Sequence, residues 1–222
     1  MLKSSIGRKF LMAITGAVLL GFVIAHMLGN LQIFLGPKVL NTYARGLQEL
    51  GALLWVARIG LLVAFIVHIA LAIQLQGENK EARPIPYEFD NTVKASLASR
   101  TMLLTGYVVL AFVLYHLAHF TFHMVHAEHI SPYVFADGKQ GNDVYRMVIL
   151  GFKNWFISGL YIVAQLVLGM HLSHGSSSMF QSLGINHPKL QPFLQKVGPT
   201  VATIIVIGNV SIPVAVLIGL VK

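Results

Sequence analysis

Five long runs of apolar residues dominate the chain, and shorter polar segments separate them. Each run is long enough to cross the roughly 30 Å of hydrocarbon in a bilayer, which takes about 20 helical residues. Lipid offers the backbone no hydrogen-bond partners, and the runs lack strand-like alternation, so we expect helices. The expected membrane-spanning segments are Lys9–Leu35, Ala52–Gln76, Thr101–Val125, Trp155–Ser178 and Thr200–Val221. The first is longer than a signal-peptide core of about 7–15 residues, so we expect it to be retained.

Two of the intervening segments have the pattern of helices that lie at a membrane surface. Val39–Leu50 places its apolar residues at helical spacing, and Val144–Phe152 has a similar character. The polar segment Gly77–Ser99 contains two prolines and is the expected surface for a soluble partner. We therefore predict an all-α protein, with residues 1–222 forming a single domain. Its expected architecture is an integral membrane bundle of five transmembrane helices.

Composition and charge support this class of protein. The chain is 55% hydrophobic and only 11% charged, whereas a soluble domain carries about 25% charged residues. The absence of cysteine excludes disulfides, thiolate haem ligands and iron–sulfur clusters held by this chain. The net charge of +8 comes from basic residues scattered between the apolar runs. This distribution indicates membrane-flanking anchors rather than a nucleic-acid-binding surface.

The basic residues also predict the orientation of the bundle. With the N-terminus inside, nine basic residues lie on the inner side and seven on the outer side. Cytoplasmic loops carry an excess of lysine and arginine, so we expect a cytoplasmic N-terminus.

Histidines inside the apolar runs are the main candidate functional residues, because histidine is costly within a bilayer. His26, His68, His116 and His171 each lie 15–17 residues after the start of their run, which is about 22–26 Å along a helix. Since consecutive helices run in opposite directions, His26 and His116 share one level, and His68 and His171 share another. Two facing imidazoles can ligate a haem iron. We therefore predict two haems stacked in the bundle, roughly 15 Å apart, with these four histidines as axial ligands.

Alternatives to this ligand set remain open. His119 and His174 follow His116 and His171 by three residues on nearly the same helical face. They are alternative ligands, partners for haem propionates, or proton carriers. Zinc is another metal candidate, and histidines that only hydrogen-bond to neighbouring helices are the plain structural alternative. No internal repeat is evident beyond the recurring histidine.

Further polar residues near the predicted outer side are candidates for accessory roles. Arg58 precedes His68 by ten residues and so lies about 15 Å nearer the outer surface, where it could bind haem propionates or extend to the interface. Glu49 is a candidate proton acceptor for quinol oxidation or a solvated surface carboxylate. His123, His126 and His129 are spaced like a metal tract, but Glu128 is the one carboxylate close to them in the chain. We expect these histidines to form an exposed interfacial face.

Several short motifs resemble those of the di-haem cytochrome b membrane-anchor subunit of bacterial succinate dehydrogenases and fumarate reductases. The resemblance covers essentially the whole chain. It is carried by Ser4-Ser5-Ile6-Gly7-Arg8-Lys9, Met12-Ala13-Ile14-Thr15-Gly16, His26-Met27-Leu28-Gly29-Asn30-Leu31, Asn79, Ala82-Arg83-Pro84, Tyr87, Tyr115-His116-Leu117 and His171-Leu172-Ser173.

The resemblance implies a location, partners and a function. His26 and His116 would ligate the haem distant from the soluble subunits, and His68 with His171 the near one. A flavoprotein and an iron–sulfur subunit would dock on the cytoplasmic face of the bacterial cytoplasmic membrane. Electrons would pass between succinate or fumarate and a membrane quinone, commonly menaquinone, while the succinate site would lie outside this chain.

The chain departs from the family pattern at one position, and three other functions are alternatives to the succinate enzyme. Some fumarate reductases carry a proton-relaying glutamate two residues before the fourth ligand, where this chain has Gly169. A proton path of that kind is therefore in doubt. The alternatives are a cytochrome b subunit of a formate dehydrogenase or hydrogenase, a haem-free transporter that uses the intramembrane histidines, and a purely structural anchor.

Overall fold

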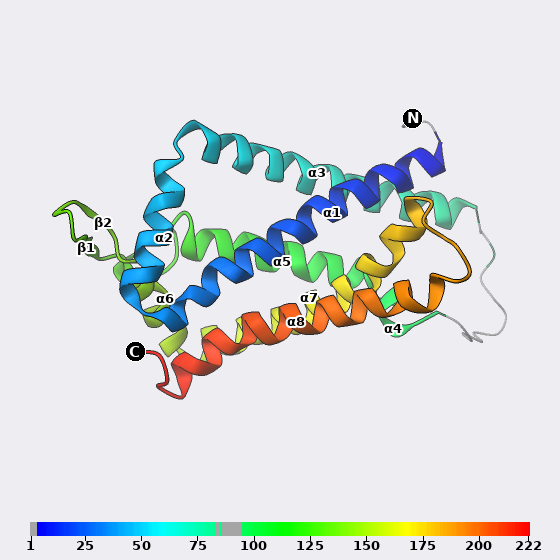
Figure 1. Cartoon of the computed structure of the whole chain (residues 1–222). Helices are drawn as coiled ribbons and strands as arrows, with labels where there is room; N and C mark the ends of the chain where they lie inside the picture. The colour runs from blue at the N-terminus through cyan, green and yellow to red at the C-terminus, as the bar shows by residue number, and fades with distance from the viewer. Residues whose placement is uncertain (1–3, 83–84, 86–94) are drawn as a thin grey trace.

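The protein is a bundle of long helices with shorter helices and one hairpin between them (Figure 1). The computed structural model describes residues 4–82, 85 and 95–222. Arg83, Pro84 and Tyr87, which carry part of the resemblance, lie outside these residues, as does the centre of the segment Gly77–Ser99. The elements are α1 (Ser5–Asn30), η1 (Leu31–Leu35), α2 (Pro37–Glu49), α3 (Ala52–Glu81), α4 (Leu97–Arg100), α5 (Met102–Phe120), η2 (Ala127–His129), β1 (Pro132–Val134), β2 (Gln140–Asn142), α6 (Val144–Lys153), α7 (Trp155–Ser182) and α8 (Gln191–Leu217).

In the part of the chain that the structure describes, five helices are long and apolar enough to cross a membrane, as the hydrophobic runs predicted. They are α1 extended by η1, then α3, α5, α7 and α8. The helices expected at Val39–Leu50 and Val144–Phe152 are also confirmed, as α2 and α6. The bundle is thus an all-α arrangement compatible with a multi-pass membrane protein.

Three of the approximate boundaries differ from the structure by five residues or more. The segment predicted as Thr101–Val125 ends as a helix at Phe120, because the amides of Phe122 and Met124 bond back to the carbonyls of Leu117 and Ala118 and close its last turn. The last helix begins nine residues before Thr200, with Pro192 in its first turn and Pro199 tolerated inside it. Helix α3 continues to Glu81, so the start of the predicted polar segment is helical.

The long helices pack around α7. Helix α8 runs along α7, α1 lies between α3 and α7, and α5 packs on α7 (Figure 1). Glycines allow the α7–α8 pair to approach closely: a Cβ at Gly169 would meet Val206, and one at Gly198 would overlap the carbonyl of Ser173. Asn209 of α8 also donates to the side-chain oxygen of Gln165 of α7, 2.9 Å away. Small residues and interhelical hydrogen bonds of this kind drive helix association in lipid.

Helix α3 lies at the edge of the bundle and packs along α1. Its large apolar side chains are exposed over most of its length, among them Leu53, Trp55, Val56, Ile59, Leu62, Val63, Ile66 and Ile73. An apolar surface of this extent is far larger than a soluble monomer exposes. It is suited to contact with lipid.

The two ends of the bundle differ. The end that carries the start of α1 is called here the N-terminal side, and the end that carries α2, α6 and the C-terminus is called the C-terminal side (Figure 1). The main cluster of buried apolar residues lies at the C-terminal side, where η1, α2 and α6 meet the start of α7 and the end of α8. Its members include Ile33, Leu40, Ile149, Phe152, Ile157, Tyr161, Ile212 and Val216.

Polar contacts join the short elements of the C-terminal side. Asn41 of α2, only 1% exposed, donates to Asp143 at 3.0 Å and accepts from the amide of Tyr145 at 2.9 Å. Strands β1 and β2 pair antiparallel in a small hairpin, with Tyr133 opposite Gly141. These contacts hold α2 and α6 across the end of the bundle, above the histidines described next.

Candidate functional site

Two of the predicted ligands lie side by side near the C-terminal side of the bundle. The rings of His26 on α1 and His116 on α5 have their centroids 5.8 Å apart, with an angle of 88° between their planes. Phe22 stacks on His26, and Phe112 packs against His116. This contact agrees with the prediction that His26 and His116 share one level of the bundle.

The other two predicted ligands are each held by a threonine of a neighbouring helix. Nδ1 of His68 lies 3.2 Å from Oγ1 of Thr15 on α1, and Nδ1 of His171 lies 3.2 Å from Oγ1 of Thr105 on α5. Both hydroxyls also donate to carbonyls of their own helix, at 3.0 Å. With the hydroxyl hydrogen used in this way, the oxygen is available as an acceptor for the tautomer that carries its proton on Nδ1. In that tautomer Nε2 keeps the lone pair that a metal requires.

Glycines next to the two threonines give these imidazoles their space. A Cβ at Gly16 would lie 3.4 Å from Cε1 of His68, and one at Gly106 would lie 3.6 Å from Cε1 of His171. The backbones of α1 and α5 therefore approach the flat side chains closely. The two arrangements are equivalent: a Thr-Gly pair on one helix contacts a histidine on another.

This equivalence reflects an internal repeat that the reading of the sequence missed. Residues 12–26 read MAITGAVLLGFVIAH, and residues 102–116 read MLLTGYVVLAFVLYH. The two segments share their Met, Thr, Gly, Val, Leu and Phe positions and end on His26 and His116. Each is followed by a short helix at the C-terminal side and then by a returning long helix: α1, α2 and α3 correspond to α5, α6 and α7. Each predicted ligand pair thus combines one histidine from each repeat.

The two alternative ligands have different surroundings. His119 is 2% exposed, and its Nδ1 lies 3.1 Å from the hydroxyl of the buried Tyr161 of α7. The same hydroxyl lies 3.5 Å from Nδ1 of His116. His119 packs against Phe120 and Gly151, whereas His116 is the residue in contact with His26. This geometry favours His116 as the ligand, with Tyr161 connecting the two imidazoles. His174 is half-buried on α7.

Arg58 is exposed on α3, and its guanidinium lies 5.1 Å from the ring centroid of Trp55. It also lines a cavity of about 210 Å³ at the C-terminal side, together with Phe120, His123 and Ser131. This location is on the His26–His116 side of the bundle, as predicted. Its role toward haem propionates stays a prediction.

Glu49 is engaged in an ion-pair network at the C-terminal side. Its Oε1 accepts from Nε of Arg45 at 2.7 Å, and the same guanidinium binds both carboxylate oxygens of Asp137 in the β1–β2 hairpin, at 3.0 and 2.7 Å. Arg45 also lies 4.7 Å from the centroid of the Phe135 ring. The hydrogen bond from Arg45 lowers the pKa of Asp137 to about 2. Glu49 lines a cavity of about 280 Å³ beside this network.

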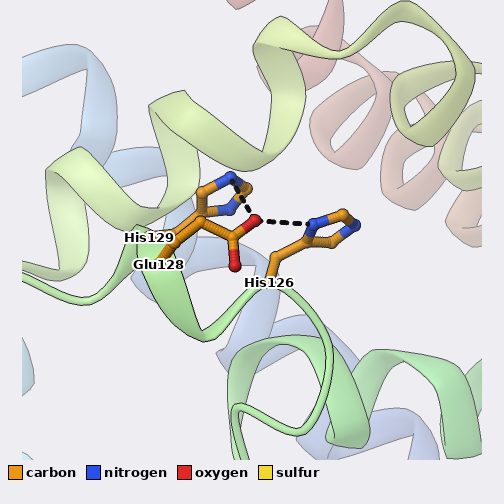
Figure 2. Close-up of side chains that lie close together, drawn as sticks. All are labelled: His126, Glu128 and His129. Carbon is orange, nitrogen blue, oxygen red and sulfur yellow. Dashed lines mark hydrogen bonds and ion pairs between the residues drawn. The ribbon is translucent and has the colours of Figure 1, made fainter.

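The third group of histidines lies in the turn after α5. His126 and His129 both approach Glu128, as Figure 2 shows. A hydrogen bond from its own backbone amide and one from His126 lower the pKa of Glu128, and burial lowers the pKa of His129. We expected these histidines to form an exposed interfacial face. The structure instead brings His126 and His129 together at the carboxylate of Glu128.

Cationic side chains also lie at the N-terminal side. Arg8 of α1 forms an ion pair with Glu78 of α3, with 2.6 Å between Nη2 and Oε1. Lys9 and Arg100, on the same side of the bundle, are exposed. The ion pair ties the start of α1 to the end of α3, the edge helix.

Comparisons of the chain with protein-family models, with curated proteins and with solved structures find no match. The resemblance to di-haem cytochromes b therefore depends on the motifs quoted above, and the assignment of a function depends on the geometry of the histidines.

Proposed function

We propose that the protein is a membrane cytochrome b that binds two haems, one between His26 and His116 and the other between His68 and His171. The observation that supports this most strongly is the repeated arrangement of the four histidines. The rings of His26 and His116 have their centroids 5.8 Å apart, so the two imidazoles are close enough that they could hold one haem iron between them.

The environment of His68 and His171 fits the same role. Histidines that ligate a metal almost always donate their second nitrogen to a nearby acceptor, which fixes the tautomer and the ring orientation. Thr15 and Thr105 are such acceptors, each 3.2 Å from Nδ1. A histidine that served only to join helices would use its hydrogen bonds in the same way. The same contact between a threonine and a histidine recurs in both repeats. This recurrence favours the role of metal ligand over that of a side chain that only joins two helices.

Haem supplies a one-electron carrier when bound, and the chain supplies its ligands, its burial and the nearby charges that tune its potential. Haems at the two levels would connect the two membrane surfaces. From the family resemblance we infer an anchor subunit of a succinate:quinone oxidoreductase, which exchanges electrons between a soluble iron–sulfur partner and membrane quinone. The N-terminal side carries the exposed Lys9, Arg100, Lys189 and Lys196. We assign it to the cytoplasm on the count of nine basic residues against seven on the other side.

The test is the haem content of the purified chain and its variants. Pyridine haemochrome analysis and reduced-minus-oxidised spectra of the wild-type chain should give two b-type haems per polypeptide. His68→Ala and His171→Ala should each remove one haem, and it should be the same one. His26→Ala and His116→Ala should each remove the other. His187→Ala changes an exposed histidine between α7 and α8 and serves as the matched control.

Two results would contradict the proposal. A folded, colourless chain would exclude the cytochrome and favour a transporter that uses the histidines without metal. Loss of different haems in His68→Ala and His171→Ala would show that the ligand pairs are wrong. Co-purification of the chain with a flavoprotein and an iron–sulfur protein would separate the succinate enzyme from the formate dehydrogenase and hydrogenase types.

A further inference from the structure

The turn that follows α5 brings three potential metal ligands together at the C-terminal side. One ligand atom from each of His126, Glu128 and His129 lies within 4.8 Å of the others. Nδ1 of His126 is 3.1 Å and Nε2 of His129 is 3.8 Å from the same carboxylate oxygen, Oε1 of Glu128 (Figure 2). In a tetrahedral zinc site with bonds of about 2.0–2.1 Å, neighbouring ligand atoms are about 3.3 Å apart. Small side-chain adjustments would therefore place all three on one ion.

The backbone of this turn has the conformation needed to present these side chains. His123 and His126 have φ angles of 53° and 60°, in the left-handed region that costs free energy for any residue except glycine. The turn of η2 follows at once, closed by a hydrogen bond of 3.0 Å from the amide of His129 to the carbonyl of His126. The segment is also fastened to the end of α5 by the amides of Phe122 and Met124. The three ligands are thus held by the fold.

Buried nitrogens without partners lie beside the three ligands. In the described part of the chain, Nδ1 of His129 and Nε2 of His119 are buried and form no hydrogen bond. His119 is 2% exposed, and its ring centroid lies 5.5 Å from that of His126 and 6.2 Å from that of His129. A Cβ at Gly151 would lie 3.2 Å from Nε2 of His119, so the glycine leaves space at that nitrogen. Buried nitrogens in this state are unusual. Nε2 of His119 is available to a bound cation, whereas Nδ1 of His129 is the second nitrogen of a ring whose Nε2 faces Glu128.

We propose that His126, Glu128 and His129 form a binding site for a divalent transition-metal ion of the zinc type. Two imidazoles and one carboxylate form a ligand set used by zinc sites that keep an open position. Magnesium and calcium prefer ligand sets made of oxygen alone, so the two nitrogen donors select against them. His119 is the nearest further imidazole and the candidate for the fourth position, which water takes otherwise.

The site is separate from the proposed haem ligands and does not depend on them. A ring contact joins it to their neighbourhood, because the ring of His126 packs against that of His119, and the hydroxyl of Tyr161 lies 3.1 Å from His119 and 3.5 Å from His116. The arrangement therefore places a metal site next to one end of the intramembrane histidine series.

The experiment measures zinc binding by the full-length chain. The protein is purified in detergent without a polyhistidine tag, treated with a chelator and titrated with Zn²⁺ by isothermal titration calorimetry. We expect one ion per chain. Glu128→Gln keeps the size of an exposed side chain and should weaken binding at least tenfold, as should His126→Gln. His187→Gln removes a histidine remote from the site and should bind as the wild-type chain does.

A second measurement identifies the ligands. Zinc X-ray absorption of the loaded chain should show nitrogen and oxygen neighbours at about 2.0–2.2 Å with the outer-shell pattern of imidazole. Circular dichroism and gel filtration establish that each variant retains the fold. No stoichiometric binding by the wild-type chain, equal affinity in folded Glu128→Gln, or a spectrum without imidazole would each overturn the proposal.

Discussion

Replacement of Thr105 by valine tests whether the threonine hydroxyls position haem ligands. Valine has nearly the shape of threonine, so the substitution removes the acceptor 3.2 Å from Nδ1 of His171 without opening a cavity. A buried donor that loses its partner costs about 1–3 kcal/mol. Loss of such a supporting hydrogen bond typically weakens metal binding about 10–100-fold, which corresponds to about 1.4–2.7 kcal/mol. Both values predict clearly weaker haem binding at the His68–His171 site.

The assay is the release of haem to an excess of a haem-scavenging apoprotein, followed by absorbance. In Thr105→Val one of the two haems should leave faster, while the haem at His26 and His116 stays as in the wild-type chain. Thr15→Val should affect the same haem, because His68 and His171 serve one site. Thr203→Val is the control, since the Thr203 hydroxyl is exposed and donates to the carbonyl of Pro199 in its own helix. If Thr105→Val and Thr15→Val retain both haems with wild-type release rates, the hydroxyls do not support ligands and the reasoning fails.

Three further predictions concern the fold. Asn41→Ala removes two hydrogen bonds between α2 and α6 and should lower the free energy of unfolding by about 2–4 kcal/mol, measured by denaturation in detergent; an unchanged value would contradict this role. Gly198→Ala forces a methyl group against α7 and should destabilise by about 1–3 kcal/mol or more, whereas a Cβ at Gly159 meets nothing within 4 Å and the matched Gly159→Ala should be tolerated. Because Arg45 lowers the pKa of Asp137 from 3.8 to about 2, their pair stabilises the hairpin above pH 3.8 and is lost as the pH falls toward 2. Pepsin should therefore begin to cut the wild-type hairpin within that window, and Asp137→Asn should already be cut at its upper end; identical profiles would argue against the pair.

The large features of the fold were predictable because they are properties of single segments. A helix that crosses lipid must be long and apolar along its whole length, and that pattern is visible without knowledge of its neighbours. The boundaries were harder to predict. The end of α5 depends on backbone hydrogen bonds made by the residues that follow it, and Pro199 gives a stop signal that the neighbouring helices override.

The candidate site was predictable in part. The depth of each histidine follows from its distance along its own helix, and the contact of His26 with His116 agrees with that arithmetic. The partners Thr15 and Thr105 were missed, because they lie 53 and 66 residues from the histidines that they hold. The Thr-Gly pair that recurs before His26 and His116 was the available signal.

By itself, the sequence determined which segments are long and apolar enough to cross a membrane, and it predicted the level of each histidine, because both follow from position along one helix. The tertiary structure decided which side chains meet: Tyr161 with His116 and His119, and Glu49 with Arg45. These pairings depend on how each helix is rotated about its axis and on which neighbour it packs against. The spacing of apolar residues and the composition specify neither the rotation of a helix nor its neighbour. Many rotations bury a similar apolar surface when lipid surrounds the bundle.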